Sequence, residues 1–265
     1  MLLNVAAYHF TNPADRPNLS DPAQLDDLRA QLLDRGRSLG LRGTILLAPE
    51  GINLVACGAA PTLRGLIDEL RALPALAALQ TKESWSRGQN FNRWLVKKKK
   101  EIITFGHLEH RPVRGRAPTV APATLARWLD AGHDDEGRRV LMLDTRNAFE
   151  VSVGTFEGAI DPQIRSFTEL PAALETHRER LRGARVVTFC TGGIRCEKAA
   201  LWLGAQDIGE VVQLDGGILG YFEAVGAQHW QGECFVFDRR VSVRPDLSEG
   251  SWQQDFATRE VHPAT

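Results

Sequence analysis

The feature that most constrains the fold is a glycine-containing loop between a predicted strand and a predicted helix. The loop comprises Cys190, Thr191, Gly192, Gly193, Ile194, Arg195 and Cys196; it follows the apolar run at 185–189 and precedes a helical pattern from Glu197. Glycine pairs permit backbone conformations that other residues avoid, so successive N–H groups can turn toward one point and hold an anion. Strand, loop and helix in this order are typical of anion-binding sites in α/β domains.

Cys190 is the candidate catalytic residue of this loop. A helix N-terminus and a nearby guanidinium, here that of Arg195, lower the pKa of a cysteine and favour the nucleophilic thiolate. Two alternatives remain at the level of the residues. Cys190 could be an inert buried thiol beside a simple turn, and Cys196 could be either a resolving thiol or a structural residue.

The first half of the chain has the element order β-α-β-β-α-β. Strands are predicted at 3–10, 44–48, 53–57 and 79–83, and helices at 22–39 and 61–73. This order predicts a ferredoxin-like α+β domain with its helices on one face of an antiparallel sheet.

The second half alternates strands with helices, which predicts a doubly wound parallel sheet covered on both faces. Asp144, Cys190 and the segment 215–217 each follow a predicted strand, so we expect them at one edge of the sheet. Asp144 and Arg146 are expected to support the loop, and a structural ion pair is the favoured role for both. The predicted boundaries are a first domain at 1–105, a basic linker at 106–120, a second domain at 121–235 and a tail at 236–265.

Charge is unevenly distributed along the chain. The net charge is −1, yet residues 84–118 contain nine basic and two acidic residues, a local charge of +7, and the aromatic residues Trp85, Phe91 and Trp94 are interleaved with these charges. This pattern fits either a solvated lysine face or a surface that contacts RNA phosphates and stacks bases. The candidate RNA-binding residues are Arg93, Lys97, Lys98, Lys99, Lys100, Arg114 and Arg116.

Composition limits the remaining classes of function. The four cysteines form no CxxC pair, and neither a metal site nor a flavin or dinucleotide fingerprint can be identified. No basic leader is present and no stretch approaches the ~20 apolar residues of a membrane span. We therefore expect a cytoplasmic protein without a membrane association, and no protein partner is evident.

Several stretches of the second half resemble a rhodanese domain over roughly residues 121–235. They are MLDTRNAFE at 142–150, GTFEGAI at 154–160, CTGGIR at 190–195 and LDGGI at 214–218. More narrowly, CTGGIRCEKAA at 190–200, TILLAPEGIN at 44–53 and CFVFD at 234–238 are similar to the bacterial rhodanese-domain family of tRNA uridine hydroxylases.

This resemblance implies an enzyme that uses molecular oxygen to hydroxylate C5 of the wobble uridine of tRNA, giving 5-hydroxyuridine. It implies the tRNA anticodon arm as the partner and Cys190 as the catalytic residue. The alternative is a rhodanese-type sulfurtransferase in which Cys190 carries a persulfide. Similar phosphatases place five residues between cysteine and arginine, whereas four lie between Cys190 and Arg195, so a phosphate should fit poorly.

Overall fold

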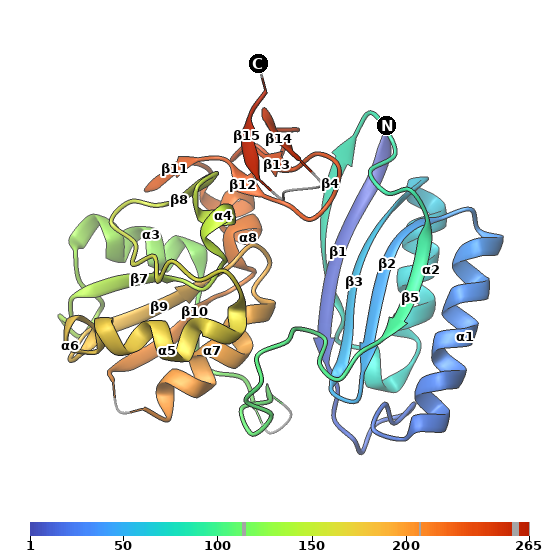
Figure 1. The fold of residues 1–265 in the computed structure, drawn as a ribbon, viewed down its shortest axis with the longest axis horizontal. Helices are drawn as coiled ribbons and strands as arrows, with labels where there is room; N and C mark the ends of the chain where they lie inside the picture. Colours follow the sequence, from blue (N-terminus) through green and yellow to red (C-terminus); the bar gives the residue numbers. More distant parts are fainter. Residues whose placement is uncertain (113–114, 207, 256–259, 265) are drawn as a thin grey trace. The chain divides into compact units, whose positions relative to one another are not determined.

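The chain forms two compact units, residues 1–104 and 105–265 (Figure 1). The structure, a computed structural model, describes residues 1–112, 115–206, 208–255 and 260–264. None of the helices in these ranges is long and apolar enough to cross a membrane.

The first unit is an α+β sandwich built on a five-stranded sheet of order β4-β1-β3-β2-β5. Its elements are β1 (Leu2–Phe10), α1 (Pro22–Ser38), β2 (Arg42–Ala48), β3 (Gly51–Gly58), α2 (Ala60–Arg71), β4 (Gln80–Ser86) and β5 (Trp94–Lys98). The strands β4, β1, β3 and β2 pair antiparallel, as the ferredoxin-like prediction requires.

Alternation along the strands of this unit places one apolar set against both helices. Leu3, Val5 and Ala7 of β1 belong to the same buried cluster as Leu28 of α1 and Leu66 of α2. The helix α1 begins after Asp21, whose Oδ1 accepts a hydrogen bond from the backbone N–H of Ala23 at 2.9 Å. A cap of this kind stabilises a helix by about 1 kcal/mol.

The lysine run lies on an edge strand that the sequence pattern did not predict. Strand β5 pairs parallel with β2, and the side chains of Lys97 to Lys100 are exposed. Trp94 at the start of this strand is buried, and its Nε1–H donates to the carbonyl of Leu32 at 2.9 Å. Trp94 is therefore a core residue, and the expectation that it takes part in base stacking is wrong.

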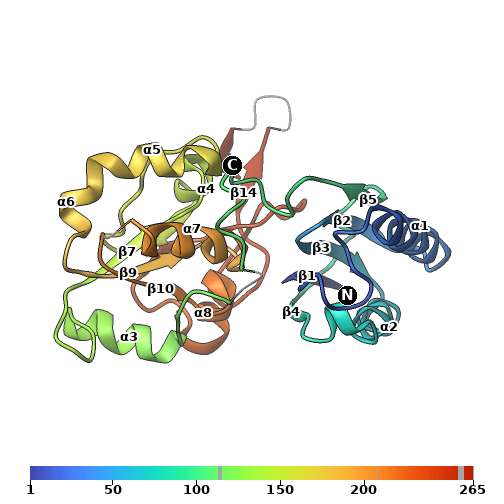
Figure 2. The ribbon, with the colours of Figure 1, turned by 90° about the horizontal axis from the view of Figure 1, so that it is seen from below.

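The second unit contains a four-stranded parallel sheet of order β6-β10-β9-β7. Its strands are β6 (Thr119–Val120), β7 (Val140–Asp144), β9 (Arg185–Phe189) and β10 (Glu210–Leu214). Figure 2 shows α3 (Pro122–Ala131) and α8 (Gly217–Val225) on one face, and α5 (Leu170–Leu174) and α7 (Ile194–Gly204) on the other. The smaller elements are α4 (Ala148–Val151), β8 (Gly154–Phe156), α6 (Arg178–Leu181) and β11 (Trp230–Gly232). This is the doubly wound arrangement expected from the sequence.

The two segments expected as linker and tail pack on the second unit. In the segment 106–120, the His107 ring lies 6.2 Å from that of Trp202, and Thr119–Val120 adds the edge strand β6 to the parallel sheet. Beyond residue 233 the chain forms β12 (Cys234–Phe235), β13 (Ser242–Val243), β14 (Trp252–Gln254) and β15 (Val261–Pro263), paired as two hairpins. Val236 and Val243 join the buried core around Phe189. These segments bury apolar side chains, which a free linker or tail would leave in solvent.

Candidate functional site

The loop at 190–196 lies at the carboxyl end of the central strand β9. Cys190 is fully buried, and the backbone N–H of Gly193 donates to its Sγ at 3.2 Å. Gly193 caps the N-terminus of α7 with a φ of 99°, a left-handed conformation that favours glycine. The turn therefore directs a backbone donor and a helix N-terminus at the same sulfur atom, and both favour its negative charge.

The N-terminus of α8 holds the other side of the loop. The backbone N–H of Ile218 donates to the carbonyl of Cys190 at 3.0 Å, and that of Leu219 donates to the carbonyl of Thr191 at 3.1 Å. Gly217 has a φ of 62°, and a Cβ there would lie 2.5 Å from the carbonyl oxygen of Cys190. The segment 215–217 thus meets the loop, and only glycine allows so close an approach.

Arg195 is held by a buried carboxylate. Its Nη1 donates to Oε2 of Glu150 at 2.6 Å and its Nη2 donates to Oε1 at 2.7 Å. Glu150 also accepts from the backbone N–H of Asn147 at 3.1 Å, which fixes the carboxylate at the start of α4. Two charges buried together in a bidentate pair hold each other in a fixed orientation. Among the described residues, the Nε of Arg195 has no hydrogen-bond partner, so one N–H remains for an anion.

The surroundings of Cys190 favour its thiolate. Burial acts to raise the pKa of the Cys190 thiol, but a hydrogen bond from the Cys196 thiol, the charge of Arg195 and backbone N–H groups outweigh it and lower the pKa to about 6. For Cys196, burial and the neighbouring Cys190 sulfur raise the pKa well above its usual range. Cys196 therefore stays protonated and serves as a hydrogen-bond donor.

The hydroxyl of Thr145 lies beside the Cys196 thiol. Thr145 Oγ1 donates to the carbonyl of Phe189 at 2.9 Å and lies 3.7 Å from the Sγ of Cys196. Because the hydroxyl proton is directed to the carbonyl, the Thr145 oxygen acts as an acceptor toward the Cys196 thiol.

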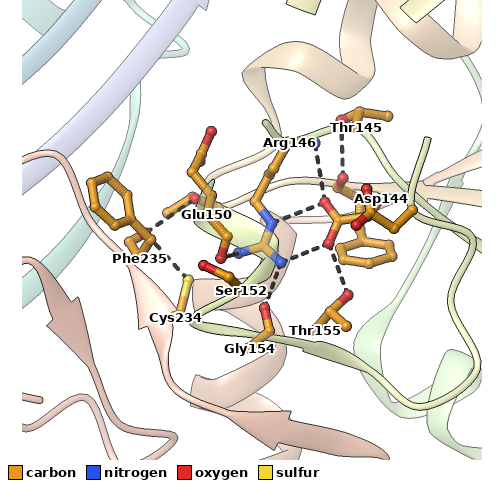
Figure 3. Close-up of polar contacts among 12 residues, drawn as sticks. Asp144, Thr145, Arg146, Glu150, Ser152, Gly154, Thr155, Cys234 and Phe235 are labelled. Carbon is orange, nitrogen blue, oxygen red and sulfur yellow. Dashed lines mark hydrogen bonds and ion pairs between the residues drawn. The ribbon is translucent and has the colours of Figure 1, made fainter. Parts of the chain in front are cut away.

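Asp144 and Arg146 form a fully buried ion pair (Figure 3). Arg146 Nε donates to Oδ1 of Asp144 at 2.9 Å, and Nη2 donates to Oδ2 at 2.6 Å and to the carbonyl of Gly154 at 2.7 Å. Thr155 Oγ1 also donates to Asp144, at 2.8 Å. Every oxygen of the carboxylate is therefore used inside the protein. The pair connects β7, α4 and β8 in the manner of a structural element.

The strand β12 covers the loop on the side of Thr191. Thr191 Oγ1 donates to the carbonyl of Phe235 at 3.3 Å. Cys234 on this strand is fully buried, and its burial raises the pKa of the thiol to about 12. Of the two thiols, Cys190 and Cys234, only the first is therefore a thiolate near neutral pH.

The basic residues expected to bind RNA are divided between the two units. Arg93 and Lys97 to Lys100 are exposed in the first unit, and Lys98 pairs with Asp26 at 2.5 Å. Arg116 belongs to the second unit, where its Nη2 lies 2.6 Å from the buried carboxylate of Glu197. Arg114 lies outside the described residues. Within the described ranges, no group of three or more His, Cys, Asp or Glu side chains is arranged to hold a metal ion.

Sequence reasoning missed three contributors to the site. Glu150 and Thr145 lie within the rhodanese-like stretch 142–150, but their roles depend on side chains distant in sequence. Gly217 belongs to the segment 215–217 that is expected at this edge, but its close approach to the Cys190 carbonyl does not follow from the sequence. A buried arginine needs a carboxylate partner, so Arg195 at a helix start was a signal that such a residue existed without indicating which one.

Several known proteins are similar to this chain. Residues 2–102 match the family model described as the UPF0176 acylphosphatase like domain. The chain is 54% identical to a tRNA uridine(34) hydroxylase of Variovorax paradoxus, over 93% of this chain and 90% of the relative. It is 49% identical to the protein of the same name from Bordetella petrii, over 97% of this chain and 98% of the relative. A rhodanese-related protein from Thermoplasma volcanium is 22% identical with a TM-score of 0.32, covering 41% of this chain and 93% of that chain.

Proposed function

Because the chain belongs to the family of tRNA uridine(34) hydroxylases, we propose that it hydroxylates C5 of the wobble uridine of tRNA, giving 5-hydroxyuridine. Molecular oxygen is the co-substrate, and Cys190 is the catalytic residue. The observation that carries the assignment of Cys190 is its sulfur, fixed by the Gly193 N–H at 3.2 Å, with a pKa lowered to about 6. A tRNA substrate also places the enzyme in the cytoplasm.

The thiolate provides a direct chemical role. In this proposal Cys190 Sγ adds to C6 of the uracil, and the electron pair of the C5–C6 double bond moves toward C5 and the O4 enolate. C5, which is now rich in electrons, reacts with O2. One oxygen atom is retained as the hydroxyl group. The other is released as water, and this requires two electrons from an external donor and two protons. Loss of the C5 proton and departure of the thiolate restore the ring.

Arg195 and the loop support this chemistry by keeping the nucleophile ionised. The guanidinium is held by Glu150, so its position does not depend on substrate. Preorganised charges and backbone donors of this kind cost no reorganisation when the reaction occurs. Asp144 and Arg146 act behind the loop as positioning residues.

A second function, sulfur transfer, is favoured by one specific observation. The unpartnered Nε–H of Arg195 and the loop N–H groups offer donors to a persulfide on Cys190. The thiolate would attack the sulfane sulfur of a donor such as thiosulfate, form the S–S bond and release sulfite, and then pass the sulfur to an acceptor.

The decisive experiment is nucleoside mass spectrometry of tRNA from cells that lack this gene, complemented with wild type, Cys190→Ala or Cys234→Ala. We expect wild type and Cys234→Ala to restore 5-hydroxyuridine derivatives and Cys190→Ala to restore none, because only Cys190 is a thiolate. Cys234 is an equally buried cysteine of the same unit and is the matched control.

Restoration by Cys190→Ala would contradict the catalytic role of that residue. Unchanged modification in the deletion strain, together with thiosulfate:cyanide sulfurtransferase activity of the pure protein, would instead establish the second function.

A further inference from the structure

An aromatic side chain beside the loop is exposed to solvent. The Phe237 side chain is 56% exposed, although it directly follows the buried residues Phe235 and Val236. Single exposed apolar residues are common on protein surfaces and need no explanation by themselves. The position of this one relative to the loop is what distinguishes it.

Phe237 is in contact with the site from two sides. The Cζ atom of Arg195 lies 5.9 Å from the centroid of the Phe237 ring, within the range of a cation–π contact. The ring also meets that of Phe235 edge to face at 5.1 Å, and the Phe235 carbonyl accepts the hydroxyl of Thr191. The exposed ring is therefore placed next to the guanidinium that supports Cys190.

The turn that presents this ring is fixed by internal contacts. Asp238 and Arg240 form an ion pair with side chains 8% and 6% exposed, and Arg240 Nε donates to Oδ1 of Asp238 at 2.9 Å. The backbone N–H of Val236 donates to the carbonyl of Val241 at 2.8 Å. A surface that is already ordered loses little entropy on binding a ligand.

Resting on the proposed function, we propose that Phe237 is a stacking platform for an unpaired base of the tRNA substrate next to the reacting uridine. Unpaired RNA bases stack on exposed aromatic side chains, and any base offers the required face. Arg195 already lies over one face of the ring, so a base stacks on the opposite face. In this proposal the base on that face belongs to the nucleotide next to the reacting uridine.

The open side of the loop gives the reacting uridine its own path. Gly192 has open space where a side chain would begin, and Thr191, Gly192 and Ile194 are partly exposed around the buried Cys190. A uridine that enters here leaves its neighbour at the level of Phe237.

The test measures binding of a synthetic anticodon stem-loop RNA that carries the fluorescent base 2-aminopurine on either side of position 34. The full chain is compared with Phe237→Ala, Phe237→Leu and Phe237→Trp. Leu108→Ala is the control, because Leu108 is an exposed apolar residue of the same unit, 48% exposed. Wild type, Phe237→Trp and Leu108→Ala should quench the fluorescence of one label. Loss of the ring should abolish this quenching and raise Kd by about 5- to 150-fold.

If the wild-type protein hydroxylates the RNA, either of two results would overturn the proposal. One is a Phe237→Ala protein that binds and quenches like wild type. The other is a Phe237→Ala protein whose Cys190 titration has moved, since the ring would then act through Arg195 and not through a base. A wild-type protein that neither binds nor modifies the RNA would refute the proposed function itself.

Discussion

At the scale of single residues, the site is a set of hydrogen bonds that decide which of several buried thiols is ionised. Cys190, Cys196 and Cys234 are all fully buried, and burial alone would raise the pKa of each. Cys190 differs because thiol and backbone donors and a guanidinium face its sulfur. Its pKa is about 6 in the folded protein and near 9.0 when unfolded, so ionisation stabilises the fold fully above pH 9 and loses that effect as pH falls through 6.

Removing the thiol donor should therefore raise the pKa of Cys190. We expect the thiolate absorbance at 240 nm to titrate near pH 6 in wild type, and Cys196→Ala to move this midpoint upward by about one pH unit, the equivalent of one hydrogen bond. Cys196→Ser keeps a donor and should move it less. Cys234→Ala is the control and should leave the midpoint in place. An unchanged midpoint in Cys196→Ala would show that Arg195 and the backbone N–H groups suffice.

At the scale of elements, the loop is shaped by two helix N-termini that meet it from different directions. The helix α7 begins at its end, and α8 donates to its carbonyl groups. Gly217 of α8 and Gly192 of the loop can be compared to test how the N-terminus of α8 supports the loop. A side chain at Gly217 would meet the Cys190 carbonyl at 2.5 Å, whereas one at Gly192 meets nothing within 4 Å.

Gly217→Ala should displace the loop and lower the hydroxylation rate by about 100-fold, since displacements near 1 Å have effects of that size. It should also lower the free energy of unfolding by about 1–2 kcal/mol, because a non-glycine residue at a φ of 62° is strained. Urea unfolding and single-turnover kinetics measure both effects. Gly192→Ala should unfold like wild type. If Gly217→Ala unfolds and reacts like wild type, the contact between α8 and the loop has no functional importance.

At the scale of the whole molecule, the notable property is a nearly neutral chain with a concentrated positive segment. Lys97, Lys99 and Lys100 are exposed on or next to the edge strand β5, while the Lys98 ammonium already pairs with Asp26. Exposed lysines that contact phosphates release counterions, and this makes binding steeply dependent on salt. The tRNA-binding role of this segment is therefore testable through salt dependence, independently of catalysis.

We expect replacement of Lys97, Lys99 and Lys100 together by alanine to weaken the salt dependence of tRNA binding. The slope of the logarithm of the binding constant against the logarithm of the salt concentration should become shallower by about 2 to 3, because each phosphate that a lysine neutralises adds about 0.7–0.9 to its magnitude. The control removes the same charge elsewhere, from the exposed Arg165, Arg180 and Arg182 of the second unit. Equal changes in both proteins would mean that net charge, and not this segment, sets the affinity.

The local patterns of the sequence were sufficient to predict the two architectures and to single out Cys190 as the candidate reactive cysteine. Periodicity, helix caps and glycine pairs act over a few residues, so the β-α-β-β-α-β order, the parallel sheet and the loop around Cys190 follow from neighbours along the chain. The same reasoning misplaced Trp94 among stacking residues and did not predict β5, because a lysine-rich edge strand lacks an apolar pattern.

Only the tertiary structure decided which distant residues complete the site. Glu150 pairs with Arg195, which lies 45 positions away in the sequence, and α8 contacts the loop through Gly217. The Phe237 ring lies over the Arg195 guanidinium. These contacts arise because parallel strands bring their carboxyl ends to one edge, and no short-range pattern encodes which side chains then face one another. The sequence by itself singled out Cys190 as the candidate nucleophile, whereas the packing of separate elements determined the hydrogen bonds and charges around its sulfur.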